Sequence, residues 1–142
     1  MKVHQITKEE VKFSVSCCEE HSTPDFTKEN GEEDEALNRE ILARSRVNQW
    51  AWCNITVMAI LPSGDSASDD LGCCSYKSEE DFKNSSSHYE DMCNDALDRL
   101  NHQIQVRAEK ALQVLIHFCE VKTPEDWKQI YDEEIVRRIH EA

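Results

Sequence analysis

Cysteine and histidine are the residues of this 142-residue chain with the widest chemical capacity, and there are seven of the first and six of the second. Structural zinc sites bring two such ligands together by spacings such as Cys-x₂-Cys or His-x₃₋₅-His. Neither spacing occurs here. The pairs Cys17–Cys18 and Cys73–Cys74 are sequence neighbours, and neighbours on a strand point to opposite faces of the sheet. The sequence therefore predicts free structural thiols and no metal site.

Catalysis by a serine or cysteine nucleophile requires an adjacent base, which a third group orients in turn. The chain has no Gly-x-Ser-x-Gly motif, and its histidines are scattered over predicted loops and helices. Phosphate-binding loops need closely spaced glycines, whereas the three glycines here lie far apart. We predict no catalytic residues, no cofactor and no enzymatic activity. An enzyme that joins one histidine and one cysteine from distant segments is an alternative.

Acidic residues dominate the composition, with 29 Asp and Glu against 16 Lys and Arg and a formal charge of −13. Such a surface is repelled by nucleic acids and by anionic membranes. We therefore expect no direct nucleic-acid binding, no membrane association, and a partner protein with a basic surface. The acids of 65–70 lack the central glycine and closing glutamate of a calcium loop, so we expect a solvated turn there.

Residues 69–98 contain nine acidic residues and two lysines, a local charge of −7. We predict that part of this segment forms an acidic surface that imitates a phosphate backbone and binds a basic groove. A simple solvated face is the alternative. Trp50 or Tyr76 would add an aromatic anchor, because aromatic residues are frequent at binding hot spots. The acidic surface consists of Glu79, Glu80, Asp81, Glu90, Asp91 and Asp95.

Three predicted strands position these residues. Alternation predicts a half-buried strand over 11–17, and a run with apolar groups on both faces predicts a central strand over 50–61. The turn-rich segment 62–70 predicts a loop, and 71–76 predicts the returning strand of a β-hairpin. Gly72 within that strand indicates a bulge or a close backbone approach. We expect segments 1–10 and 19–34 to be flexible.

Helical periodicity accounts for most of the remainder. An amphipathic helix is predicted over 35–46, with Leu37, Ile41 and Leu42 on its apolar face. Ser78 has the position of an N-cap for one helical turn that closes at Phe82. A long helix is predicted over 89–121, and its late half carries an apolar stripe wide enough for a homodimer contact. Pro124 begins a C-terminal helical extension over 123–142.

The order of these elements predicts one domain over 1–142 of the α+β class. A small antiparallel sheet with a β-hairpin would be packed by the long helix and by flanking shorter helices. No apolar run follows the N-terminal methionine and no stretch approaches the ~20 apolar residues of a membrane span. We therefore expect the protein in the reducing cytoplasm, where its cysteines remain thiols.

Four short motifs lie within residues 48–105, and they are Trp50-Ala-Trp52-Cys53, Leu71-Gly72-Cys73-Cys74-Ser75-Tyr76, Ser78-Glu79-Glu80-Asp81-Phe82 and Tyr89-Glu90-Asp91-Met92. Together they resemble a family of small uncharacterised proteins of tailed phages and prophages. The family has no assigned reaction, so the resemblance implies no catalytic residue. It implies a host cytoplasm and a non-enzymatic accessory protein that blocks or modulates a host macromolecule, as anti-defence and host-takeover proteins do. The alternative is a homodimer that holds a nucleotide near Arg99 and Arg107.

Overall fold

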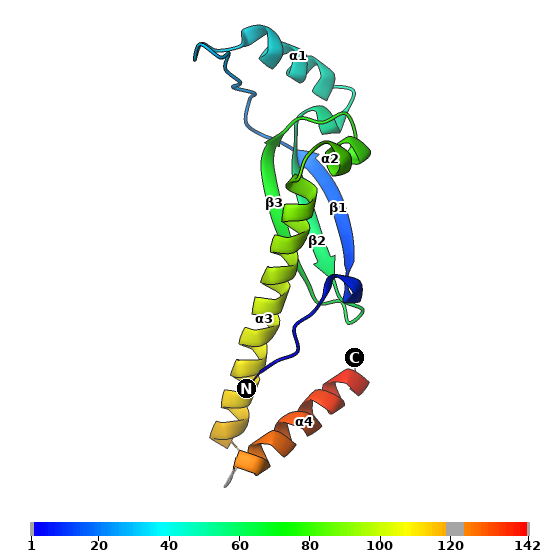
Figure 1. Ribbon diagram of the computed structural model, residues 1–142, viewed down its shortest axis with the longest axis vertical. Helices are drawn as coiled ribbons and strands as arrows, with labels where there is room; N and C mark the ends of the chain where they lie inside the picture. The colour runs from blue at the N-terminus through cyan, green and yellow to red at the C-terminus, as the bar shows by residue number, and fades with distance from the viewer. Residues whose placement is uncertain (1, 119–123, 142) are drawn as a thin grey trace. The chain divides into compact units, whose positions relative to one another are not determined.

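A computed structural model of the chain describes residues 2–118 and 124–141. Two compact units follow from its contacts, one of residues Thr7–Leu100 and one of Met1–Ile6 with Asn101–Ala142. The first unit contains the whole sheet (Figure 1). The sheet and helices confirm the predicted α+β class.

The sheet has three antiparallel strands in the order β1-β2-β3. These are β1 (Lys12–Glu19), β2 (Cys53–Ile60) and β3 (Ser66–Cys74). β1 pairs with β2 along its full length without a register shift, from Lys12 opposite Ile60 to Glu19 opposite Cys53. The central position predicted for the second strand is therefore confirmed.

The β2–β3 hairpin is longer than the sequence indicated. A short turn closes it, with a hydrogen bond from the Leu61 amide to the Asp65 carbonyl (2.8 Å) and Gly64 at φ 90°. β3 then begins at Ser66, so the prediction of a loop over 62–70 and of a solvated turn at 65–70 was wrong from residue 66 onward. Pairing with a buried central strand outweighs the weak β-propensity of serine and aspartate.

A β-bulge interrupts the end of β3. Cys53 lies opposite Cys74, but Ile55 lies opposite Leu71, which leaves one extra residue on β3. Cys73 adopts φ 57°, a left-handed conformation that is uncommon for a residue with a side chain. A Cβ atom on Gly72 would lie 3.1 Å from Glu20 Oε2. The bulge that the sequence indicated at Gly72 is confirmed, whereas the group that lies close to Gly72 is a side-chain carboxylate and not a backbone.

The helix α1 (Glu35–Ser45) begins where the periodicity predicted, and the Asp34 carboxylate accepts the Leu37 amide as its cap (3.2 Å). Its buried residues are Ile41 and Asn38, whereas Leu37 and Leu42 are exposed, so the predicted apolar face was partly wrong. The Asn38 side chain is buried because it exchanges two hydrogen bonds with the backbone of Phe26 (2.9 and 3.2 Å).

Short 3₁₀ turns precede two of the strands, over Lys8–Glu10 and Gln49–Ala51. The second contains Trp50, which therefore lies outside the strand in which the sequence placed it. Its geometry is fixed by the Asn48 side chain, which accepts the Trp50 amide (3.1 Å).

Three further helices complete the described chain. Ser78 caps α2 (Glu79–Ser85) as predicted, by accepting the Asp81 amide (3.1 Å), although the helix extends beyond the single turn expected. The predicted long helix is confirmed as α3 (His88–Phe118), and the part expected over 119–121 lies outside the described residues. α4 (Pro124–Glu141) begins at the predicted proline.

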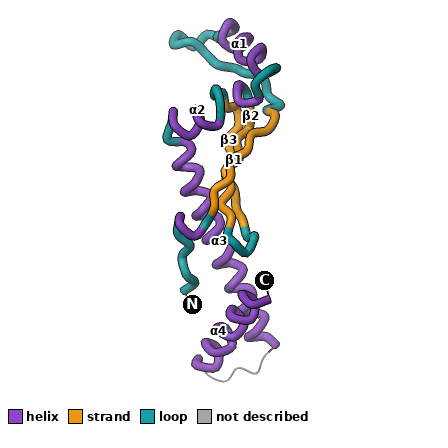
Figure 2. Tube along the Cα trace, turned by 90° about the vertical axis from the view of Figure 1, so that its right-hand side faces the viewer, coloured by secondary structure: helices purple, strands orange, loops and turns teal. Residues whose placement is uncertain are grey.

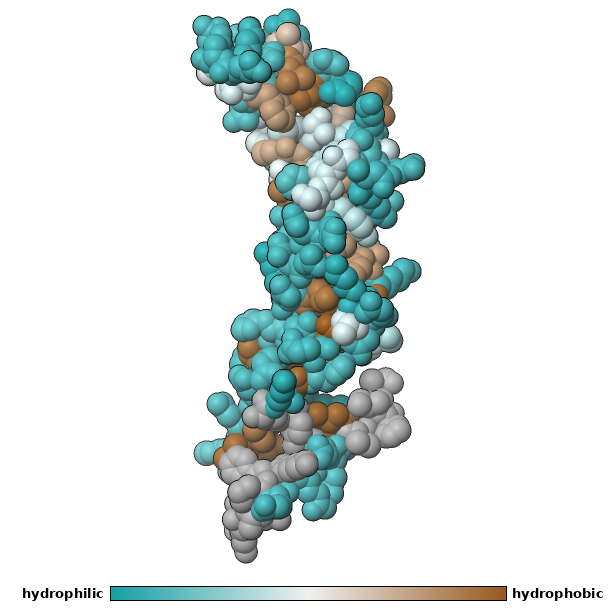
Figure 3. Space-filling view, in the orientation of Figure 1, coloured by the Kyte–Doolittle hydropathy of each residue, from teal (hydrophilic) through white to brown (hydrophobic). Residues whose placement is uncertain are grey.

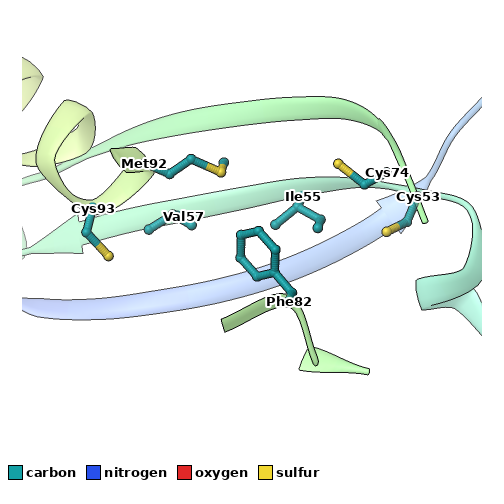
Figure 4. Packing of buried hydrophobic residues seen from close by; sticks show 7 residues of the cluster. All are labelled: Cys53, Ile55, Val57, Cys74, Phe82, Met92 and Cys93. Carbon is teal, nitrogen blue, oxygen red and sulfur yellow. The ribbon is translucent and has the colours of Figure 1, made fainter. Parts of the chain in front are cut away.

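The core of the first unit lies between the sheet and two helices. α2 and the first half of α3 lie on one side of the sheet, and the other side carries no helix over most of its length (Figure 2). Alternate residues of β2 are fully buried on the helical side. Phe82 enters this core from α2, fully buried among aliphatic and sulfur-containing side chains (Figure 4). Phe82 is therefore the single residue by which α2 contributes to the core.

In the second unit, Asn101 of α3 binds the backbone of the N-terminal segment. The Asn101 side chain accepts the Ile6 amide (2.7 Å) and donates to the Ile6 carbonyl (3.1 Å). The last turns of α3 expose Val114, Ile116 and Phe118. Among the described residues, no helix combines the length and apolarity needed to cross a bilayer.

Candidate functional site

The acidic surface lies on α2 and on the first turns of α3. Glu80, Glu90, Asp91 and Asp95 are all exposed, and no basic side chain pairs with them in the described part of the chain. Asp91, Asp95 and Asp98 follow helical spacing, so their Cα atoms rise by about 6 Å and then about 4.5 Å along the axis. The outer side of these turns is largely hydrophilic (Figure 3). Asp91 and Asp95 therefore share one face of α3 with Asp98, whereas Glu90 lies about 100° round the helix from Asp91 and Glu80 lies on α2.

Two predicted members of the surface have interactions within the chain. Glu79 lies 3.9 Å from Lys83, an exposed pair four residues apart. The half-buried Asp81 accepts the Lys77 amide (2.8 Å) and so fixes the start of α2. The other four members of the surface, Glu80, Glu90, Asp91 and Asp95, are exposed and available to a partner.

The two candidate aromatic anchors pack against Phe82. Trp50 stacks on its ring at a centroid distance of 6.2 Å, and Tyr76 meets it edge-on at 5.2 Å. The Tyr76 amide also donates to the Trp50 carbonyl (2.8 Å). Both side chains are half-buried, so each presents only part of its ring to solvent while it supports the core beneath the acidic helices.

The buried thiols form no activated nucleophile. Cys53 and Cys74 lie opposite each other on β2 and β3. Burial, followed by the charge of neighbouring thiols, raises the pKa of Cys53 to about 12, and burial raises the pKa of Cys74 to about 11. Burial is also the largest cause of the raised pKa of Cys17. Thiolates are the reactive form, so a raised pKa lowers the reactivity of these three thiols.

The exposed thiols differ in their surroundings. Cys18 lies on β1 and Cys73 lies in the bulge, where its Sγ atom is 3.4 Å from the Ser22 hydroxyl. A serine hydroxyl is not a base and cannot activate a thiol. Among the described residues, no group of three His, Cys, Asp or Glu side chains has the arrangement of a metal site, and the six described cysteines are free.

Glu20 holds the bulge in place. Its carboxylate accepts the Cys73 amide (2.9 Å) and both the amide (3.1 Å) and the hydroxyl (3.0 Å) of Ser22. The hydrogen bond from Cys73 is the largest cause of a lowered Glu20 pKa, and those from Ser22 add to it. The ionised carboxylate therefore stabilises the folded state.

We expect acid to weaken this contact. Because the folded-state pKa of Glu20 is lowered, its contribution is present above the unfolded value of 4.5 and is lost as pH falls through the folded value. The urea midpoint of the native protein should therefore fall more between pH 6 and pH 3 than that of Glu20→Gln. Glu29→Gln, which removes an exposed loop carboxylate, should behave like the native protein. Parallel curves for the native protein and Glu20→Gln would contradict this role.

A cavity of about 410 Å³ lies at the C-terminal end of β1. Trp52 forms part of its wall and is fixed by an indole hydrogen bond to the Ser22 carbonyl (2.8 Å) and by the edge of Phe26, with ring centroids 5.9 Å apart. The sequence reading missed this cavity, because 19–34 was interpreted only as an acidic loop. Its polar lining includes Glu19, Glu20, His21, Ser22, Thr23 and Gln49.

No family model, curated protein or solved structure matches this chain. The interpretation of the acidic surface and of the cavity therefore depends on their own geometry.

Proposed function

We propose that this chain is a non-enzymatic binding protein whose acidic surface engages a basic surface of another macromolecule. The observation that supports this best is the set of four exposed carboxylates, Glu80, Glu90, Asp91 and Asp95, that lack a basic partner within the described chain. They stand on helices that pack over a buried core, so their positions are set before a partner arrives. Preorganised charge reduces the ordering cost of association.

Electrostatics indicate how such a surface would work. A concentrated row of negative charge raises the association rate with a basic partner and selects against acidic ones. A row of carboxylates along a helix also resembles the linear charge of a nucleic-acid strand. Together with the sequence resemblance to small phage proteins, this favours an accessory protein that occupies a nucleic-acid-binding groove of a host protein and blocks or modulates it.

A homodimer is the second candidate, and it depends on a different observation. Val114 and Phe118 are four residues apart, so they share one face near the end of α3, and both are exposed, with Phe118 at 78% exposure. An apolar helix surface of this kind is typical of a contact between helices. A nucleotide in a shared cleft has less support, because Arg99 already pairs with Asp69 (2.9 Å) and donates to the Ser68 carbonyl (2.7 Å).

Affinity capture from the native host tests the proposal. The tagged full chain is incubated with host extract at about 50 mM and about 500 mM salt, since exposed charges are strongly screened at the higher value. We expect a basic, nucleic-acid-handling protein to be retained at low salt and lost at high salt. Recovery of no such protein at low salt, or recovery that is insensitive to salt, would count against the acidic surface.

A further inference from the structure

The two edges of the sheet are not equivalent. The edge strand β3 contains a bulge, its Ser68 carbonyl accepts Arg99, and its Cys73 amide is bound by Glu20. Bulges, charges and blocked backbone groups are the usual means by which proteins prevent a further strand from pairing. β3 is therefore a protected edge.

β1 has none of these features. Its pairing with β2 is continuous over eight residues, and its charged residues Lys12 and Glu19 stand only at the two ends. In the described chain, no backbone group of β1 has a backbone hydrogen bond outside its pairing with β2. Because successive residues of a strand point their amide groups to opposite sides, half of those groups face away from β2. β1 thus offers a regular row of donors and acceptors.

The side chains along β1 also suit an added strand. On the helical side, Phe13, Val15 and Cys17 pack against the core but stay only half-buried. On the other side, Ser14 and Ser16 are small and exposed. A strand added beside β1 would cover the apolar side chains on the helical side. The two small serines on the other side would not obstruct it. Strand addition of this kind takes affinity from the backbone and specificity from a nearby pocket.

The cavity at the end of β1 supplies such a pocket. Glu19 and Glu20 line it, and the carboxylate of Glu20 is held ionised by its hydrogen bonds. Trp52, which is 5% exposed, also lines the cavity, and its two carboxylates favour a guanidinium or ammonium group. Charge complementarity therefore indicates a basic occupant and disfavours a second copy of this strongly acidic chain.

We propose that β1 and this cavity form a docking site for an extended basic segment of a partner protein, which pairs antiparallel with β1 and places an arginine or lysine between Glu19 and Trp52. The segment begins with its basic residue, since an antiparallel strand has its N-terminal end at the C-terminal end of β1. This site is separate from the acidic surface of α2 and α3, and it stands or fails independently of that surface.

The test uses the full chain and a terminally blocked peptide, Arg-Thr-Val-Thr-Val-Thr-Val, with a matched peptide that has Gln in place of Arg. We expect the Arg peptide to slow hydrogen exchange at alternate amides of β1 and at none of β3. It should bind roughly tenfold more tightly than the Gln peptide, the scale of one charge-assisted hydrogen bond.

Two variants with the same change in net charge locate the contact. Glu19→Lys should weaken binding of the Arg peptide by about tenfold, whereas Glu29→Lys, on the exposed loop, should leave it within about twofold. No protection of β1, or equal binding of the two peptides, would overturn the proposal. Protection of β1 that rises with protein concentration in the absence of peptide would also overturn it, because a second copy would then be the occupant.

Discussion

Phe82→Ala should lower the free energy of unfolding by about 3–5 kcal/mol, the range for removing a fully buried aromatic side chain. Phe82 has no exposed surface and contacts three aromatic rings, with Tyr89 edge-on at 5.8 Å in addition to Trp50 and Tyr76. Its removal leaves a cavity that α2 cannot fill, because α2 contributes only this residue to the core. Domains of this size are stable by about 5–15 kcal/mol, so much of the margin would be lost.

Urea unfolding followed by tryptophan fluorescence measures this effect. Asn84→Ala is the matched control, since Asn84 lies in the same helix and is exposed. Its effect should stay within about 0.7 kcal/mol, the range of helix propensity. A loss below about 1 kcal/mol for Phe82→Ala would mean that α2 does not pack on the sheet. The packing that positions Glu79, Glu80 and Asp81 would then be absent.

Alkylation of the thiols should separate two groups of cysteines by at least about a thousandfold in rate. With a pKa of about 12, only about one Cys53 thiol in ten thousand is ionised at pH 8, against roughly a quarter for an ordinary thiol. Burial also keeps the reagent away from Cys53 and Cys74. Cys18 and Cys73 are exposed and should react first.

Iodoacetamide labelling at pH 8, with tandem mass spectrometry to separate neighbours in one peptide, gives the rate at each site. In denaturing urea, all of these cysteines should react at similar rates, which controls for sequence context. Rapid modification of Cys53 in the native protein would reveal an activated thiol in an accessible pocket. That result would favour the enzyme hypothesis over the binding protein proposed here.

The elements with the strongest local signals were predictable from sequence. Ser78 identified the start of α2, Pro124 identified the start of α4, and the helical periodicity of 89–121, broken only at Arg107, identified α3. β3 was underestimated because Ser66–Asp70 has poor β-propensity, and only pairing with β2 makes it a strand. The residues of this segment alone do not show that it pairs with the buried strand β2.

The site was less predictable than the fold, for a related reason. Sequence located the acidic residues but could not show that Asp81 and Glu79 have partners within the chain, while Glu90, Asp91 and Asp95 lack a basic one. The cavity beside Trp52 is lined by Ser22 and Trp52, which are 30 residues apart and are joined by the hydrogen bond from the Trp52 indole to the Ser22 carbonyl. Contacts over such separations arise only once the chain has folded.

The central claim is that four carboxylates on α2 and α3, rather than net charge alone, bind a basic partner. The most direct measurement is the association rate with the captured partner at low salt for two variants that each remove four negative charges. One carries Glu80→Gln, Glu90→Gln, Asp91→Asn and Asp95→Asn, and the other carries Gln at Glu29, Glu32, Glu33 and Glu35. We predict that the first loses at least about tenfold in rate and most of its salt dependence, while the second stays within about threefold of the native protein. Equal losses in the two variants would contradict the claim.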